Sequence, residues 1–197
     1  MRIVGGTLRG RKIEPPLSTV TRPMMDRVRQ ALFNVLEHRD WGKGIGDLFD
    51  EDTHVLDAFC GTGALAFEAV SRGAGHAALF DRDAQALKIA RGNAAHLGIE
   101  DKCAIFAVDA TNPPPAPHPA KLVFLAPPYR KNLIPASFAA LDTAGWIAPH
   151  AVIVAETAKN ETLETPEGCE LVLARGYGEP MLHFFRRWND NVTSIRP

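Results

Sequence analysis

Short apolar runs alternate with helical segments through the middle of the chain. The run at 55–59 is followed by a helical segment at 64–72, and the same order is repeated afterwards. The predicted strands are 55–59, 76–80, 103–108, 122–125 and 151–156, and the predicted helices between and after them are 64–72, 84–97 and 132–143. Strands that alternate with helices indicate a mainly parallel, doubly wound sheet of the α/β class.

The two ends of the chain follow other patterns. Residues 2–24 are rich in Gly, Pro, Thr and Arg, which indicates a hairpin or an extended arm. Four apolar residues between 28 and 36 share one face of a helix that is predicted over 26–39. Near the other end, strands at 169–175 and 180–188 would form a hairpin. Such a hairpin would place an antiparallel strand at the end of the sheet.

The length and the charge suggest one domain with a basic appendage. A chain of 197 residues suits an α/β domain at 41–190, an arm and helix at 1–40 and a tail at 191–197. The net charge of −1 gives no overall signature of nucleic-acid binding, but the first 30 residues carry seven Lys and Arg residues against two acids. A segregated basic segment can bind phosphates, and the alternative is a solvated arm.

Cysteines and apolar runs bear on the environment of the protein. Cys60, Cys103 and Cys169 are odd in number and far apart, without the paired spacing of a zinc site. They indicate reduced thiols, and no metal site is expected. The N-terminus lacks an apolar signal region, and no apolar run is long enough to cross a membrane. We therefore expect a cytoplasmic monomer without membrane contacts.

A glycine loop follows the first strand of the predicted sheet. Gly61 and Gly63 allow a tight turn and a close approach of the backbone to a ligand. The following helix directs its amino end at the same place. Asp57 precedes the turn, and Asp81 ends the next strand, where a carboxylate can bind two ribose hydroxyls. Asp109 ends the third strand, where it can meet the amine of an adenine. These positions predict a nucleotide site, whereas the alternative is a tight turn without a ligand.

The nucleotide could be NAD or S-adenosylmethionine (SAM). The dinucleotide fingerprint needs a third glycine at position 66, which is Ala66 in this chain. Asp57 beside the loop would repel a pyrophosphate, but it can accept a hydrogen bond from the ammonium group of a methionine moiety. SAM is therefore the better fit.

The strand at 122–125 ends in a motif of rigid and aromatic residues. Ala126, Pro127, Pro128 and Tyr129 match the pattern of an acid or amide, Pro-Pro and an aromatic residue. That pattern is typical of enzymes that methylate exocyclic amines of nucleic-acid bases. The two prolines present backbone carbonyls in fixed directions, and Tyr129 offers a face for stacking. The simpler interpretation is that Pro-Pro merely ends a strand.

Segments of the N-terminal arm, of the helix that follows it and of the region around the glycine loop resemble the RsmD family. The resemblance covers nearly the whole chain and rests on Arg2–Gly6, Arg9–Lys12, Arg22–Pro23, Asp26–Arg29, Leu32–Asn34, Leu56–Leu65, Glu68–Ala69, Ser71–Ala74 and Asn93. It implies a class I SAM-dependent methyltransferase with a Rossmann-like doubly wound sheet. It further implies methylation of the exocyclic N2 amine of a guanine in 16S ribosomal RNA (rRNA), on the small ribosomal subunit or its assembling form.

The resemblance also assigns roles to residues. Asp57, Gly61, Gly63, Asp81 and Asp109 match the positions that bind SAM in the family. The motif residues Pro127, Pro128 and Tyr129 match its acceptor site. The cations that the basic arm would direct at RNA are Arg9, Arg11, Lys12 and Arg22.

Ala126 departs from the family, which has Asp or Asn at this position. A neighbouring group or the backbone carbonyls could replace the missing acceptor and leave a slower enzyme. Alternatively, the chain binds SAM and RNA without turnover, as an assembly factor, or the residue is a sequence variant. We expect an enzyme of reduced activity, because the other motif positions are intact.

Overall fold

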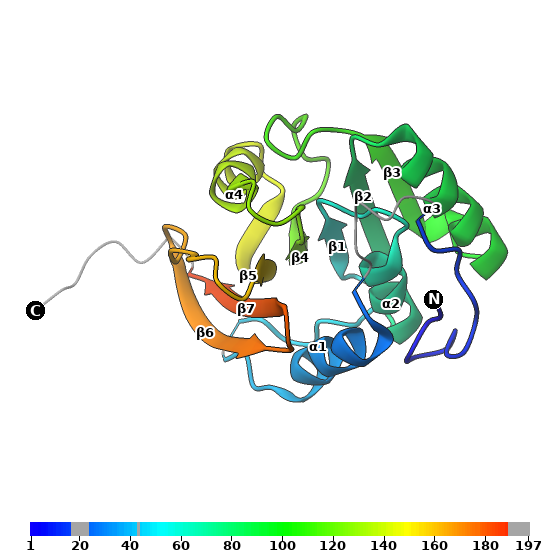
Figure 1. The fold of residues 1–197 in the computed structure, drawn as a ribbon, viewed down its shortest axis with the longest axis horizontal. Helices are drawn as coiled ribbons and strands as arrows, with labels where there is room; N and C mark the ends of the chain where they lie inside the picture. Colours follow the sequence, from blue (N-terminus) through cyan, green and yellow to red (C-terminus); the bar gives the residue numbers. More distant parts are fainter. Residues whose placement is uncertain (17–23, 43, 189–197) are drawn as a thin grey trace, which may run out of the picture.

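One seven-stranded mixed sheet organises the part of the chain that the structure describes. This computed structural model describes residues 1–16, 24–42 and 44–188. The strand order is β3-β2-β1-β4-β5-β7-β6 (Figure 1). The strands are β1 (His54–Asp57), β2 (His76–Asp81), β3 (Cys103–Ala107), β4 (Ala120–Leu125), β5 (Ile147–Ala158), β6 (Cys169–Gly176) and β7 (Pro180–Arg187).

The five strands β1 to β5 are parallel, and β7 is antiparallel to both of its neighbours. This order is that of a class I methyltransferase, and it confirms the predicted sheet. The predicted hairpin is present, and its second strand lies inside the edge that β6 forms.

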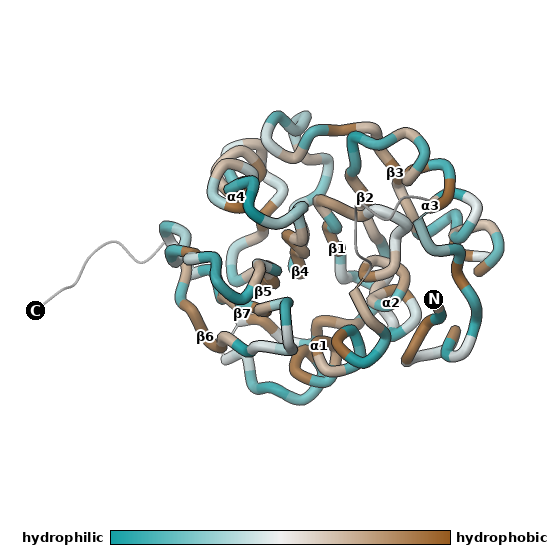
Figure 2. Tube along the Cα trace, in the orientation of Figure 1, coloured by the Kyte–Doolittle hydropathy of each residue, from teal (hydrophilic) through white to brown (hydrophobic). Residues whose placement is uncertain are grey.

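Helices cover both faces of the sheet. The helices are α1 (Asp26–His38), α2 (Ala64–Arg72), α3 (Ala84–Leu97) and α4 (Leu133–Thr143), with a short 3₁₀ helix at Glu100–Lys102. Successive side chains of a strand point to opposite faces, so Val55 packs with α1, α2 and α3, whereas Leu56 packs with α4. The strands lie between these two layers of helices. Figure 2 shows hydrophobic positions along two of them, β4 and β5.

The N-terminal arm packs against α2 as a bent segment. Arg2 and Lys12 form an isolated antiparallel bridge, and the side chains of Ile3 and Ile13 are buried in the core. The Thr7 amide donates to the Ser71 carbonyl of α2 over 2.7 Å. The described part of the arm, residues 1–16, is therefore docked on the sheet domain.

A buried network of charges joins the arm, α1 and α2. The side chain of Arg29 is fully buried; its Nε lies 3.0 Å from Glu68 Oε1, and its Nη2 donates to the Arg2 carbonyl over 2.5 Å. Glu68 Oε1 also accepts from the Val4 amide over 2.6 Å, and Arg72 pairs with Glu68. Buried charges are tolerated when their hydrogen bonds are satisfied in this way.

Candidate active site

Parallel strands bring their carboxyl ends to one edge of the sheet. Asp57 ends β1, Asp81 ends β2, and Ala126 follows β4 directly. Glu156 lies near the end of β5, next to β4. This edge is where α/β proteins usually bind their ligands.

The glycine loop is fastened to β2. The Gly61 amide donates to Asp81 Oδ2 over 2.8 Å, and the Cys60 amide donates to the Phe80 carbonyl over 2.8 Å. Gly63 has φ of +88°, and a Cβ there would lie 2.3 Å from the Phe67 ring, so internal packing requires this glycine. Gly61 has φ of +52° and faces open space, so a ligand can approach the loop at Gly61.

Asp57 is a buried carboxyl group with an unsatisfied atom. The residue is 1% exposed, and Oδ1 has no hydrogen-bond partner among the described residues. Burial, followed by the charge of Asp81, raises the pKa of Asp57 to about 7, and the backbone amides of Ala66 and Phe59 act in the opposite direction. A buried acceptor without a partner suits a cationic donor.

Asp81 and Asp109 are more exposed, and both hold turns. Asp81 Oδ1 accepts from the Asp83 amide over 2.9 Å, in addition to the bond from Gly61. Asp109 Oδ1 accepts from the amide and the hydroxyl of Thr111, over 2.9 and 2.7 Å, and Arg82 pairs with Oδ2 at 3.1 Å. The Thr111 hydroxyl, more than Arg82, lowers the pKa of Asp109. Contact of Asp109 with an adenine stays a prediction.

The proline motif lines a small pocket at the ends of β4 and β5. Pro127 is buried, Pro128 is exposed, and Tyr129 is half-buried. The pocket is lined by Pro127, Pro128, Tyr129, Asn132, Glu156 and Leu163, among others. The Tyr129 hydroxyl donates to Glu156 Oε1. The sequence prediction missed Glu156, although an acid in the apolar strand predicted at 151–156 is a visible signal.

The loop after the motif has a strained backbone. Arg130 and Asn132 have φ of 61° and 50°, in the left-handed region that residues other than glycine seldom adopt. Glu161 holds this loop to β5, because its Oε1 accepts from the Arg130 amide over 2.5 Å and its Oε2 from the Ala158 amide over 2.7 Å.

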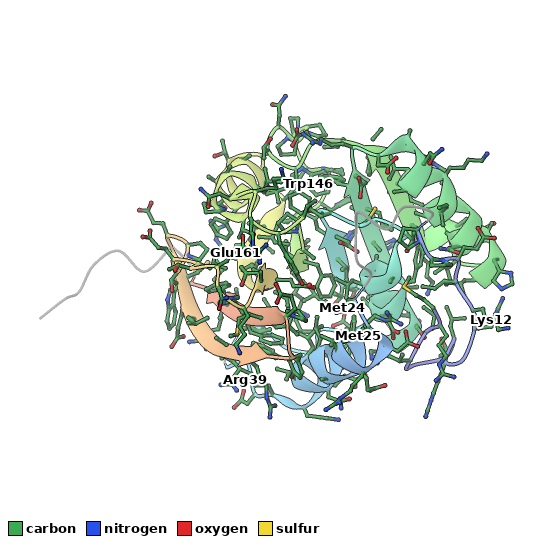
Figure 3. The ribbon with its side chains drawn as sticks, in the orientation of Figure 1. Lys12, Met24, Met25, Arg39, Trp146 and Glu161 are labelled. Atoms are coloured by element: carbon green, nitrogen blue, oxygen red, sulfur yellow. The ribbon has the colours of Figure 1, made fainter. Side chains whose placement is uncertain are left out.

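The cations of the arm lie away from this pocket. Arg9, Arg11 and Lys12 are exposed, and the Arg11 guanidinium donates to the His96 carbonyl of α3. In Figure 3, Lys12 lies at the right edge of the molecule, whereas Glu161 lies left of its centre. Arg22 lies outside the described residues. The described arm cations and the pocket therefore lie on different parts of the molecule.

The described residues lack two kinds of feature. They contain no group of three or more His, Cys, Asp or Glu side chains that could hold a metal ion. They also contain no helix with the length and apolar character needed to cross a membrane.

Several known proteins are similar to this chain in sequence and in fold. Ribosomal RNA small subunit methyltransferase D of Escherichia coli is 33% identical over 165 residues, which cover 84% of this chain and 78% of that protein. The protein of the same name from Haemophilus influenzae is 32% identical over 187 residues, with coverage of 90% and 89%.

Solved structures agree with this result. The Escherichia coli protein yhhF is 30% identical, with a TM-score of 0.79 over 96% of this chain and 99% of that one. An RNA methyltransferase from Salinibacter ruber, solved with S-adenosylhomocysteine, has a TM-score of 0.60 at 14% identity, over 86% of this chain and 95% of that one, and this likeness concerns the fold alone. The family model described as Conserved hypothetical protein 95 matches residues 1–186. The putative rRNA methyltransferase YlbH of Bacillus subtilis is 30% identical over 184 residues, with coverage of 89% of this chain and 91% of that protein. The chain therefore belongs to this family of RsmD-like and YlbH-like methyltransferases.

Proposed function

We propose that the protein transfers the methyl group of SAM to the exocyclic N2 amine of a guanine in 16S rRNA of the small ribosomal subunit. The observation that carries the proposal is the buried, unpartnered Oδ1 of Asp57, at the end of the strand that leads into the loop with the open Gly61 and one strand away from the motif at 126–129. The names of the Escherichia coli and Haemophilus influenzae relatives support rRNA as the substrate.

The residues at the strand ends fit the donor. SAM carries a positively charged ammonium group, which suits the unpaired Asp57 Oδ1, and ribose hydroxyls, which suit the half-exposed carboxylate of Asp81. The bound donor supplies an electrophilic methyl group. Asp109 would lie beside the adenine, and the open side of Gly61 would let the donor approach the backbone.

The acceptor site would be formed by the motif. Tyr129 would stack on the guanine, and the carbonyls at Ala126 and Pro127 would accept from its amine. The arm cations Arg9, Arg11, Lys12 and Arg22 would hold RNA phosphates, which is the role we propose for the segment 1–40 beside a methyltransferase domain at 41–190. The proposed enzyme works as a monomer in the cytoplasm.

A second function has a specific observation in its favour. Ala126 offers only a backbone carbonyl where the family pattern has an acid or amide side chain. A protein that binds SAM and RNA without transfer would assist subunit assembly and would not need that side chain.

A transfer assay separates the two functions. Tritiated SAM is mixed with small ribosomal subunits from a strain that lacks the family enzyme, and label in the 16S rRNA is counted. We expect methyl incorporation at one guanine. The Asp57→Ala variant should lose this incorporation, and calorimetry would check whether it has also lost SAM binding. Tight binding of SAM and subunits with no incorporation, at any enzyme concentration, would favour the assembly factor.

A further inference from the structure

The register of β4 and β5 places a carboxylate beside Ala126. The last printed pair of the parallel ladder joins Leu125 to Ala155, so the next two residues along these strands are Ala126 and Glu156. Residues opposite each other in a ladder point to the same face. Leu125 and Ala155 share one core cluster, and Ala126 packs against the other, as this alternation requires.

Glu156 is held by the motif itself. The Tyr129 hydroxyl donates to its Oε1, and both side chains line the same pocket as Pro127 and Pro128. The bond occupies one of the two carboxylate oxygens, so the other can accept from a second donor.

The surroundings of Glu156 make its carboxylate more basic than an exposed one. Burial raises the pKa of Glu156, while the hydrogen bond from Tyr129 lowers it. A carboxylate with a raised pKa accepts a proton more readily than an exposed one.

We propose that Glu156 is the side-chain acceptor for the target amine, in place of the group that Ala126 lacks, and that Tyr129 fixes its orientation. This inference rests on the proposed function. The amine nitrogen donates its lone pair to the new N–C bond, while the S–C bond of the donor breaks and its electron pair goes to sulfur. The proton that the amine releases passes to Glu156 and then to water.

Glu156→Gln tests the assignment. Gln keeps the size of the side chain and can still accept from Tyr129, but it cannot take the proton. We expect single-turnover transfer to small subunits to fall by roughly 10²–10³, with unchanged SAM affinity. At saturating SAM, where the pH dependence of donor binding through Asp57 does not contribute, the wild-type rate should rise with pH as Glu156 ionises, and the variant should lose that dependence. Glu179→Gln is the matched control, because Glu179 pairs with Arg130 at 3.6 Å and does not line the pocket.

A rescue variant distinguishes chemistry from folding. In the Glu156→Gln background, Ala126→Asp should restore most of the lost rate, since an acid returns to the motif position. Wild-type rates in Glu156→Gln would overturn the inference, and so would a wild type that is inactive where Ala126→Asp is active. If neither the wild type nor Ala126→Asp labels RNA although both proteins bind SAM, the proposed function fails together with the inference.

Discussion

At the scale of single residues, Asp57 combines a structural cost with the binding role that we propose for it. Its carboxyl group is buried at the end of β1, its pKa is raised to about 7, and Oδ1 has no partner among the described residues. The neutral form is therefore favoured in the free protein at mildly acidic pH. A cation beside Oδ1 reverses this preference.

The first prediction concerns the pH dependence of SAM binding. The ammonium group of SAM needs the ionised carboxylate, so its affinity should fall as pH drops below about 7, by up to about tenfold per unit. Calorimetry at pH 6 in two buffers of different ionisation enthalpy should detect proton release on binding. Affinity that is equal at pH 6 and pH 8 would remove Asp57 from the donor site.

The second prediction concerns the stability of the free protein. Because the pKa of Asp57 is about 7 in the fold and 3.8 when unperturbed, the folded state binds more protons between these values, and this residue destabilises the fold as pH rises through them. Asp57→Asn should therefore stabilise the protein more at pH 8 than at pH 5, by about 1–3 kcal/mol. Urea unfolding of both forms at the two pH values measures the difference, and an equal effect at both would contradict it.

At the scale of elements, the strands and helices could be predicted, whereas the docking of the arm could not. Buried parallel strands are short apolar runs, so β1, β2 and β4 are visible in the sequence. The arm is held by bonds to Glu68, Ser71 and Asn93, more than 60 residues away, which leave no local pattern. The acid Glu156 is visible in the predicted strand at 151–156, but its position beside Ala126 depends on the register of the β4–β5 ladder, which the sequence does not show.

The third prediction tests how the arm is docked. A Cβ at Gly6 would lie 1.9 Å from the Ser71 carbonyl, whereas a Cβ at Gly10 meets nothing within 4 Å, and both residues have positive φ. Gly6→Ala should therefore cost about 2–4 kcal/mol of unfolding free energy, and Gly10→Ala about 1 kcal/mol from backbone strain alone. Equal losses in thermal unfolding would mean that the arm is not packed on α2.

At the scale of the whole molecule, the basic arm and the pocket lie on different parts of the surface. Asn93 connects the arm to the glycine loop: its Oδ1 accepts from the Glu14 amide over 2.7 Å, and its Nδ2 donates to the Thr62 carbonyl of that loop over 3.1 Å. The arm is thus fixed relative to the proposed donor site. A large RNA can then be positioned by phosphate contacts far from the reacting amine.

The fourth prediction concerns these phosphate contacts. Replacing Arg9 and Lys12 with Gln should weaken binding to small-subunit RNA and reduce the slope of log K against log salt by about 1–2. SAM affinity should not change, because both residues are exposed and outside the donor site. Filter binding over a salt series measures the slope, with Lys88→Gln on α3 as the control for charge. An unchanged slope would exclude the arm from the RNA interface.

The position of β7 has a consequence for biosynthesis. This strand is made after both of its neighbours, yet it lies between β5 and β6 and pairs with each. Until residues 180–187 emerge from the ribosome, β5 has an open edge, which is a template for pairing with other chains. We therefore expect a chain stopped at residue 179 to be digested by protease or to aggregate, and a chain released after 188 to resist. Protection before residue 180 would show that β5 closes against something else during synthesis.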